Sequence, residues 1–371
     1  MAELFIHTDR IRSNVEKLSA YFQVRGVQWS LVTKVFSGDL DFLQAILTEE
    51  TVSGIHSVGD SRLTSLKNLK QVYPGLRTIY IKPPAKMYAD EIVRFADVSL
   101  NSSATTIRAL SQAALEQETQ HKVIIMVEQG ELREGVTVEN LFGVFSQVHA
   151  LPHIQIIGIG SNLGCMYGIE PSPEKFAQLM QVRSELERKF KVDIPYISAG
   201  TSISLPLLAS GVVPQAINHF RIGEAVFFGL SPLKNEPFED LHTETFEFHA
   251  NIIELETKEV VPEGVISDSN IGHTVDFNQE DAGETSVKAI LDFGMLDVDK
   301  NDLDTTEPGI SFVGITSDMI VVDLGSNKQA DGSQRYRVGD VMVFKPNYMA
   351  VARLLNSKFI DKQFLGVPQA I

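Results

Sequence analysis

The feature that most constrains the fold is a regular alternation of short apolar segments with amphipathic segments between residues 28 and 221. The apolar segments are rich in Val, Ile and Leu, as strands buried on both faces are, and the segments between them repeat apolar residues at helical spacing. Eight strands, each but the last followed by a clear helix, fit into about 200 residues, as a (β/α)8 barrel requires. The pattern therefore predicts a TIM-type α/β barrel, with an open doubly wound sheet as the alternative.

The predicted strands of this barrel are a strand that ends at Lys34 and the segments Ser53 to Val58, Arg77 to Lys82, Asp97 to Leu100, Lys122 to Val127, Ile154 to Ile159, Tyr196 to Ser198 and Ala216 to Arg221. The predicted helices between them start at Leu40 and cover Ser61 to Val72, Lys86 to Phe95, Ala104 to Gln117, Val138 to Ala150, Pro173 to Phe190 and Ser202 to Ala209. A strand at Leu4 to His7 and a helix that starts at Thr8 precede them.

The pattern changes near Pro232, and from Glu244 onward apolar residues alternate with polar ones at period two. Further strands are predicted at Val287 to Phe293, Ile310 to Ile315, Met319 to Leu324 and Val341 to Phe344, with a long polar loop from Ser267 to Glu284. We therefore predict two domains, a barrel at residues 1–232 and a C-terminal β-rich domain at residues 233–371.

Composition excludes several classes of partner. The formal net charge is −16 and no basic block is present, which argues against nucleic acid and anionic membrane surfaces. No apolar run is long enough to span a bilayer, and the N-terminus does not read as a targeting segment. Cys165 is the only cysteine, so a disulfide within the chain is impossible, which suits the cytoplasm. Pro152 separates His149 from His153, so no zinc pair, and no other metal site, is expected.

The chemistry of a (β/α)8 barrel takes place at the carboxyl ends of its strands. A lysine at such an end, as Lys34 is, either extends its ammonium to water or reacts as an amine, typically as a Schiff base with a carbonyl cofactor. Arg133 and Arg221 follow later strands, which predicts a mouth positive enough for an anionic ligand. Other candidates at the strand ends are Asp60, Arg62, Glu128, Glu131, Asn162, Cys165 and Glu224.

Two glycine turns on adjacent strands suit a phosphate. Gly200-Thr201-Ser202 opens a predicted helix, so backbone N–H groups and two hydroxyls would face the mouth, although ordinary helix capping explains these residues as well. Gly223, between Ile222 and Glu224, lets a ligand approach the backbone. A phosphate together with an aldehyde that reacts with Lys34 describes pyridoxal phosphate.

Five motifs, kept in order over nearly the whole chain, resemble the alanine racemase-like, fold-type III pyridoxal phosphate enzymes, and most closely their ornithine racemase branch. They are Leu31-Val32-Thr33-Lys34, the stretch from Val127 to Gly135, Ser198-Ala199-Gly200-Thr201-Ser202, Phe220-Arg221-Ile222-Gly223-Glu224 and the stretch from Ser317 to Asp323. The resemblance implies an isomerase that interconverts the L and D forms of a free amino acid by a two-base mechanism at Cα.

The resemblance also implies roles for single residues. Lys34 would hold the cofactor and act as one of the two bases, and Arg221 would hold the pyridine nitrogen. Because a guanidinium stays protonated and can only donate, the ring nitrogen would remain neutral. Arg133 would lie near the ring hydroxyl, and Asp318 would arrive from the partner subunit of a homodimer. The phosphate would be bound by Thr201, Ser202, Gly223 and Tyr348, and Asn162 and Glu224 complete the expected cofactor site.

The departures from the family concern the substrate and the second base. Alanine racemases carry a tyrosine after the lysine and a histidine at the end of strand six, where this chain has Gly38 and Asn162, so ornithine, lysine or a similar amino acid is expected rather than alanine. Their opposite-face base is a tyrosine, and this chain has none between Tyr196 and Tyr336. We expect His273 in that role because imidazole titrates near neutrality, with Cys165 as a second candidate.

Two rival functions follow from the same motifs. A fold-type III decarboxylase would also use Lys34, but it typically contributes a cysteine from its second domain, where this chain has none. A small pyridoxal phosphate carrier would keep the barrel and lack a β-rich domain. The segment from Glu244 to Ile371 therefore favours an enzyme over a carrier.

Overall fold

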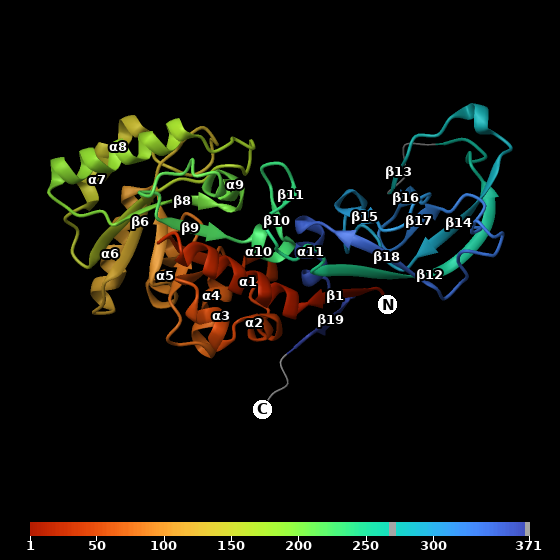
Figure 1. Ribbon diagram of the computed structural model, residues 1–371, viewed down its shortest axis with the longest axis horizontal. Coiled ribbons are helices and arrows are strands. Elements are labelled where there is room, and N and C mark those ends of the chain that lie inside the picture. The colour runs from red at the N-terminus through yellow and green to blue at the C-terminus, as the bar shows by residue number, and fades with distance from the viewer. Residues whose placement is uncertain (267–271, 368–371) are drawn as a thin grey trace. The chain divides into compact units, whose positions relative to one another are not determined.

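The computed structural model describes residues 1–266 and 272–367. These form two compact units, one of residues 8–243 and one that combines residues 1–7 with residues 244–367 (Figure 1). The sequence predicted a boundary at residue 232 and assigned the first strand to the barrel domain. In the structure that strand belongs to the β-rich unit, because it pairs with strands from the C-terminal third of the chain.

Residues 8–243 contain the predicted barrel. Eight parallel strands close on themselves in chain order from β2 to β9, which confirms the (β/α)8 prediction over the open sheet. The strands are β2 (Gln28–Val32), β3 (Ser57–Asp60), β4 (Thr78–Tyr80), β5 (Val98–Asn101), β6 (His121–Met126), β7 (Ile154–Gly160), β8 (Tyr196–Thr201) and β9 (His219–Ile222). The helices are α1 (Thr8–Gln23), α2 (Leu40–Ile46), α3 (Glu49–Ser53), α4 (Leu63–Val72), α5 (Ala89–Phe95), α6 (Ala104–Glu116), α7 (Val138–Val148), α8 (Pro173–Phe190), α9 (Leu205–Ala209) and α10 (Glu224–Phe228).

Local sequence signals explain where these helices begin. The side chain of Ser172 accepts a hydrogen bond from the backbone N–H of Lys175, and Pro173 occupies the first turn, so α8 starts where it was predicted. The prediction of a strand from Ser53 was wrong at its start, because Thr48 and Thr51 form a capping box that begins α3. The helix predicted from Ser202 to Ala209 is a single 3-10 turn followed by the short α9.

The barrel strands direct alternate side chains inward and outward. The ring of Phe220 lies 5.2 Å from that of Phe22 in α1, so Phe220 faces the helices. His219 and Arg221, on either side of it, therefore face the barrel interior. Together with Ser30, Ser57 and Ser198, to which they are connected by hydrogen bonds, they form what we call the polar sector.

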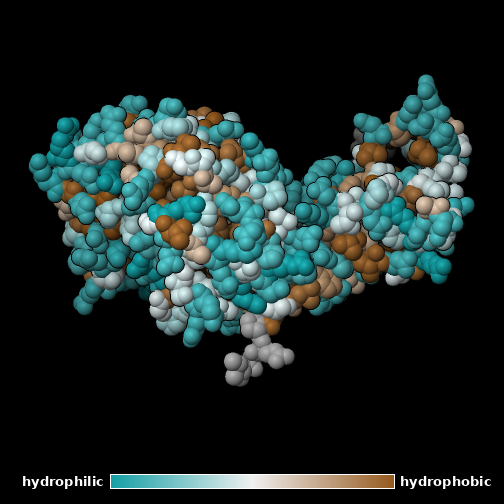
Figure 2. Space-filling view, in the orientation of Figure 1, coloured by the Kyte–Doolittle hydropathy of each residue, from teal (hydrophilic) through white to brown (hydrophobic). Residues whose placement is uncertain are grey.

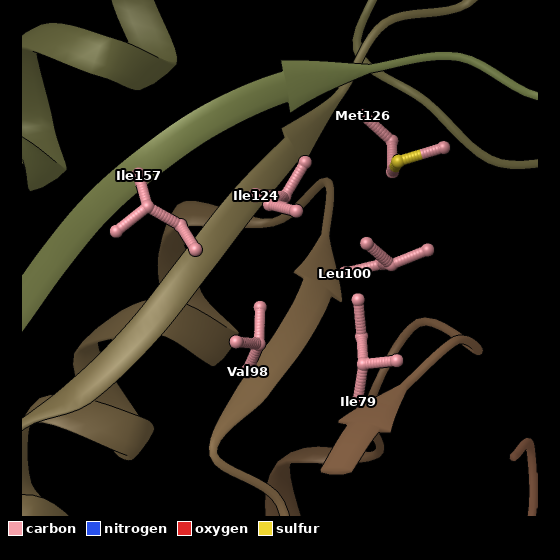
Figure 3. Packing of buried hydrophobic residues seen from close by; sticks show 6 residues of the cluster. All are labelled: Ile79, Val98, Leu100, Ile124, Met126 and Ile157. Carbon is pink, nitrogen blue, oxygen red and sulfur yellow. The ribbon is translucent and has the colours of Figure 1, made fainter. Parts of the chain in front are cut away.

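The other half of the interior is apolar. Buried side chains from β4, β5 and β6 pack together, with Ile157 of β7 against them (Figure 3). We call Ile79, Val98, Leu100, Ile124 and Met126 the apolar sector; each is no more than 2% exposed. Burial of this hydrophobic surface, about 25 cal/mol for each Å2 removed from water, stabilises this side of the barrel.

The β-rich unit is built on a nine-stranded sheet. Strand β1 (Glu3–His7) lies between β12 (Phe246–Glu259), with which it pairs antiparallel, and β19 (Asp361–Leu365), with which it pairs parallel. The sheet also contains β13 (His273–Thr274), β14 (Thr285–Leu291), β15 (Leu303–Thr305), β16 (Ser311–Ile315), β17 (Ile320–Asp323) and β18 (Val341–Pro346). The four predicted strands after residue 284 are present within a few residues of their predicted bounds.

Sequence periodicity missed one helix of this unit, α11 (Tyr348–Asn356), which Asn347 caps by accepting hydrogen bonds from the N–H groups of Met349 and Ala350. The predicted loop from Ser267 to Glu284 contains β13 and a 3-10 turn (Gln279–Asp281), and its residues 267–271 lie outside the described part of the chain. Among the described residues, no helix combines the length and the apolar character that crossing a bilayer requires. On the face drawn in Figure 2, hydrophilic side chains cover most of both units and hydrophobic ones occur in smaller groups.

Candidate active site

Most of the predicted site residues lie at one end of the barrel. Lys34, Arg133, Asn162, Thr201 and Arg221 end or follow β2, β6, β7, β8 and β9, whose carboxyl ends face the same way in a parallel barrel. Ser202, Gly223 and Glu224 follow β8 and β9 directly. The structure therefore brings together the predicted residues of the barrel mouth.

Lys34 does not end a strand, as the sequence suggested, but begins a 3-10 turn two residues beyond β2. The turn ends at Ser37, whose φ of 52° is left-handed, and Gly38 continues with φ 77°. Glu224 lies in the electrostatic reach of Lys34: burial raises the pKa of the Glu224 carboxyl, and the lysine charge opposes that rise. The paired strands β2 and β9 thus bring an amine and a carboxyl group within electrostatic reach of each other.

Arg221 is the most firmly held cation of the mouth. Its Nη1 donates to the backbone oxygen of Ser198 at 2.5 Å and to the Ser198 Oγ at 2.6 Å, and its Nη2 donates to the backbone oxygen of Ser161 at 2.7 Å. Burial lowers its pKa to about 10, so the guanidinium remains protonated at neutral pH. These bonds use three of its five N–H groups, which leaves donors for a ligand atom.

The hydroxyl of Ser161 fits the presence of such a ligand. Its oxygen is buried beside Arg221, and within the described residues it has no hydrogen-bond partner. An unpaired buried hydroxyl costs free energy unless something accepts or donates to it, so the site suits a polar ring atom next to Arg221. The residues present therefore fit the pyridoxal cofactor that the sequence suggested.

Arg133 lies in the loop after β6 and is held by its neighbour. Its guanidinium forms a two-pronged ion pair with Glu134 and also contacts the sulfur of Cys165. Burial alone would raise the pKa of Glu134, but Arg133 lowers it overall, so this carboxylate stays charged. Arg133 is consequently oriented before any ligand binds.

The exposed Cys165 lies in a second mouth loop that Glu131 organises. The buried carboxylate of Glu131 accepts hydrogen bonds from the backbone N–H groups of Cys165, Tyr167 and Ile169, at 2.8 to 3.0 Å. Glu131 is therefore committed to holding the loop and is not available to a substrate.

Packing accounts for one of the two glycine turns. A Cβ on Gly200 would lie 2.2 Å from the ring of Phe220, so glycine is required there even without a phosphate. A Cβ on Gly223 would lie 3.2 Å from the backbone oxygen of Val32, which is tight but less severe. The Ser202 hydroxyl already accepts from the N–H of Ala225 and can still donate its own proton to a ligand. The phosphate role of these residues stays a prediction.

Asp60, predicted at the mouth, is fully buried. Its carboxylate accepts hydrogen bonds from the Thr33 hydroxyl at 3.2 Å and from the N–H of Arg62 at 2.9 Å. Burial raises its pKa to about 6 against these bonds. Asp60 therefore supports the segment that carries Lys34.

His273, Asp318 and Tyr348 lie in the β-rich unit. His273 is exposed and pairs with Ile315 of β16, and Asp318 occupies the exposed turn between β16 and β17, so the two belong to neighbouring parts of one sheet. Tyr348 begins α11. Their contribution to the site remains a prediction. The described residues contain no group of His, Cys, Asp or Glu side chains that could hold a metal ion.

Sequence reasoning placed Ser161 at the end of a strand without a role, and it missed Glu134, Ser198 as a side-chain partner, and His219 around Arg221. Ser198 and Glu134 were part of recognised motifs, but no role was assigned to them. The strand alternation itself contained a signal for His219, since a histidine two residues before Arg221 must share its face of the strand.

Comparisons with known proteins agree with this geometry. Residues 6–232 match the family model described as alanine racemase, N-terminal domain. The chain is similar to an ornithine racemase of Acetoanaerobium sticklandii, 29% identical over 98% of this chain and 99% of that protein, and to a lysine racemase of Thermotoga maritima, 29% identical over 97% and 98%. The fold matches a crystal structure of alanine racemase from Corynebacterium glutamicum, with a TM-score of 0.69, 16% identity, and 98% and 99% of the two chains covered.

Proposed function

The chain belongs to the alanine racemase family and is an amino acid racemase, and on that premise we propose that it interconverts the L and D forms of a free cationic amino acid, ornithine or lysine, with pyridoxal 5'-phosphate bound at the barrel mouth. The observation that carries the substrate class is the similarity, over at least 97% of the chain, to one ornithine racemase and one lysine racemase. A decarboxylase and a cofactor carrier, the two rivals, have no comparable support.

The cofactor supplies an electron sink for the negative charge that develops at Cα. Lys34 would hold the cofactor through its amine and would move a proton to or from Cα on one face of the substrate. Arg221 would donate to the ring nitrogen through one of its remaining N–H groups and would keep its own proton, since its pKa of about 10 lies well above neutrality. Arg133, oriented by Glu134, would donate near the ring hydroxyl.

A carboxylate is needed for the second ammonium group of ornithine or lysine. Of the carboxylates at the strand ends, Asp60 is buried, Glu131 holds a loop, Glu128 accepts from the N–H groups of Gly130 and Leu132, and Glu224 is within electrostatic reach of Lys34. Asp318 is exposed, and within residues 1–266 and 272–367 the hydrogen bond found to its carboxylate comes from the neighbouring hydroxyl of Ser317. We assign the distal ammonium group of the substrate to Asp318, contributed by the partner subunit of a homodimer in the cytoplasm.

The second base acts on the opposite face of Cα. We assign this role to His273, an exposed imidazole on the same sheet as Asp318. Cys165 is the alternative, because its side chain is exposed and its sulfur contacts the Arg133 guanidinium. Each candidate can be replaced without disturbing a buried core.

The test of the function is exchange of the Cα proton in deuterated water, measured by mass spectrometry over a panel of amino acids. We expect exchange with loss of optical rotation for ornithine or lysine, and none with Lys34→Ala. Release of labelled carbon dioxide would show a decarboxylase instead. Cofactor binding without exchange on any amino acid would show a carrier. The oligomeric state follows from light scattering, for which we expect a dimer.

The test of the second base compares His273→Ala with Cys165→Ala. Loss of one base slows proton transfer on one face, so the racemisation rate should fall at least about 100-fold, within the range that general acid–base groups contribute. Near-normal rates in both directions would remove His273 from the mechanism. A loss confined to Cys165→Ala would assign the role to the thiol.

A further inference from the structure

The polar sector continues below Arg221 as an unbroken row of hydrogen bonds through the barrel. The Ser198 Oγ, which accepts from Arg221, lies 2.7 Å from the Nδ1 of His219. The Nε2 of His219 lies 3.0 Å from the Ser30 Oγ, which lies 2.6 Å from the Ser57 Oγ. None of the three serines is more than 1% exposed, and neither is His219.

The row ends near the opposite end of the barrel. The Ser57 Oγ lies 3.3 Å from the Nδ1 of His56, and the Nε2 of His56 lies 2.6 Å from the Nη1 of Arg77, an exposed residue that precedes β4. We call Ser198, His219, Ser30, Ser57 and His56 the histidine–serine chain. A guanidinium therefore stands at each end of it.

The guanidinium of Arg77 fixes the proton of His56, and the directions of the other hydrogen bonds are traced from there. A guanidinium only donates, so the Nε2 of His56 must accept from Arg77, and the proton of a neutral His56 must be on Nδ1. That proton points to Ser57. In the arrangement that keeps the proton of each hydroxyl within the row, Ser57 donates to Ser30 and Ser30 donates to the Nε2 of His219.

The Nδ1 of His219 then carries the proton and donates to the Ser198 Oγ. That oxygen accepts two hydrogen bonds, one from His219 and one from Arg221. A proton added to His56 would set its Nε2–H against the Arg77 guanidinium, and a proton added to His219 would require the Ser30 hydroxyl to turn away and accept. Donors at both ends also mean that the row cannot relay a proton from one end to the other.

We propose that the histidine–serine chain is a positioning device for Arg221, in which His219, as the neutral tautomer protonated on Nδ1, fixes the Ser198 oxygen that holds the guanidinium. The fixed Ser198 oxygen decides which N–H groups of Arg221 remain for a ligand. The effect on cofactor binding rests on the proposed function. The assignment of the histidine tautomers is independent of it. His219 is a positioning residue, since its contact to the site passes through Ser198.

The barrel wall contains a matched control. The Nε2 of His121 lies 2.7 Å from the Ser99 Oγ, both residues are no more than 1% exposed, and Ser99 alternates with the inward-facing Val98 and Leu100. This second histidine–serine pair is therefore equally buried on the helix-facing side, and no hydrogen bond found for it leads to Arg221. The Ser99 Oγ also accepts from the Nδ2 of Asn101, so Ser99→Ala removes two buried side-chain hydrogen bonds, as Ser198→Ala does.

The first experiment reads the tautomers directly. Long-range proton–nitrogen NMR of protein labelled with 15N-histidine distinguishes the two neutral tautomers and the charged form, with the His56→Asn and His219→Asn variants assigning the signals. We expect both histidines to be neutral and protonated on Nδ1 at pH 7. A proton on the Nε2 of His219, or a charged ring, would overturn the proposal, whatever the enzyme binds.

The second experiment measures the affinity of the apoenzyme for pyridoxal 5'-phosphate by absorbance titration. We expect Ser198→Ala to weaken binding about tenfold and Ser99→Ala to change it less than twofold. His219→Asn keeps a side-chain N–H at the position of Nδ1 and should stay within about threefold of wild type, whereas His219→Gln reaches the position of Nε2 and should be about tenfold weaker.

Thermal unfolding of each variant separates positioning from general damage. A purely structural role would lower stability in Ser198→Ala and Ser99→Ala alike and leave cofactor affinity equal in both, which would contradict the proposal. If His219→Gln does not fold, the comparison of Ser198→Ala with Ser99→Ala still tests the proposal. A wild-type apoenzyme that does not bind pyridoxal 5'-phosphate would refute the proposed function. The NMR experiment would still test the tautomers of the histidine–serine chain.

Discussion

The two halves of the barrel interior solve the same structural problem with different chemistry. The apolar sector fills its space with Ile, Leu, Val and Met side chains that have no hydrogen-bonding needs (Figure 3). The polar sector instead contains three serines, a histidine and an arginine that are joined by hydrogen bonds between their side chains. Packing tolerates small shifts, whereas a hydrogen-bonded row fixes angles, and only the second kind of interior can orient a cation.

The largest effect is expected from a substitution in the apolar sector, which should lower the free energy of unfolding of the protein. Leu100→Ala opens a cavity among buried side chains and should cost about 2–5 kcal/mol of unfolding free energy. Chemical denaturation measures the loss. Activity per folded molecule should remain near that of wild type, and a large fall in it would show that this half of the barrel also serves the site.

The counterpart in the polar sector is Arg221→Leu. Loss of the guanidinium removes a preorganised donor from the mouth, and the turnover rate should fall about 10²- to 10³-fold. Steady-state kinetics with saturating cofactor measures it. Arg221→Lys serves as the control for charge alone and should recover little activity, because an ammonium cannot reproduce the forked bonds to Ser198 and Ser161. Full recovery by lysine would mean that orientation is unimportant.

Low pH should lower the free energy of unfolding because the barrel buries neutral histidines. Burial lowers the pKa of His121 from 6.5 to about 4, so the unfolded chain binds the proton first as pH falls. The free energy that the neutral His121 contributes to folding is fully present above pH 6.5 and is lost as the pH falls to 4. The difference between the two pKa values corresponds to about 3 kcal/mol of unfolding free energy. Unfolding at pH 7 and pH 5 should show a smaller difference in His121→Asn than in wild type. An equal difference would contradict the burial of a neutral ring.

The smallest effect concerns Arg133. Glu134→Gln keeps the shape and one acceptor but removes the charge that orients this arginine, and should raise KM for the amino acid about tenfold or less, in keeping with the modest worth of a half-exposed ion pair. Glu128→Gln, in the same loop, controls for the loss of one negative charge. Equal KM changes in both variants would assign the effect to overall charge.

The repeating architecture was predictable because its signals are local. Ser172 and Pro173 mark the start of α8 within the sequence itself, and the apolar strands are bounded by polar or glycine residues. Short elements were not predictable in this way. The capping box of Thr48 begins a five-residue helix in a segment that resembles a strand, and α11 follows a long region of period-two alternation.

The candidate site was predictable as a set of strand ends but not as a network. Lys34, Arg133 and Arg221 could be placed at one mouth from the order of strands alone. The reason for Gly200 depends on the ring of Phe220, and the link from Arg221 to His219 depends on the register between β8 and β9. Register between strands is set by tertiary packing, which no single segment contains.

The pairing of β1 with β12 and β19 has a consequence for how the protein is made. The first seven residues leave the ribosome long before either partner strand, and the whole barrel at residues 8–243 is synthesised in between. Because domains fold as they emerge, the barrel can mature while the N-terminal strand waits unpaired. The β-rich unit is then assembled late, because β1 finds its partners only after β12 and β19, which follow the barrel in the chain, have been synthesised.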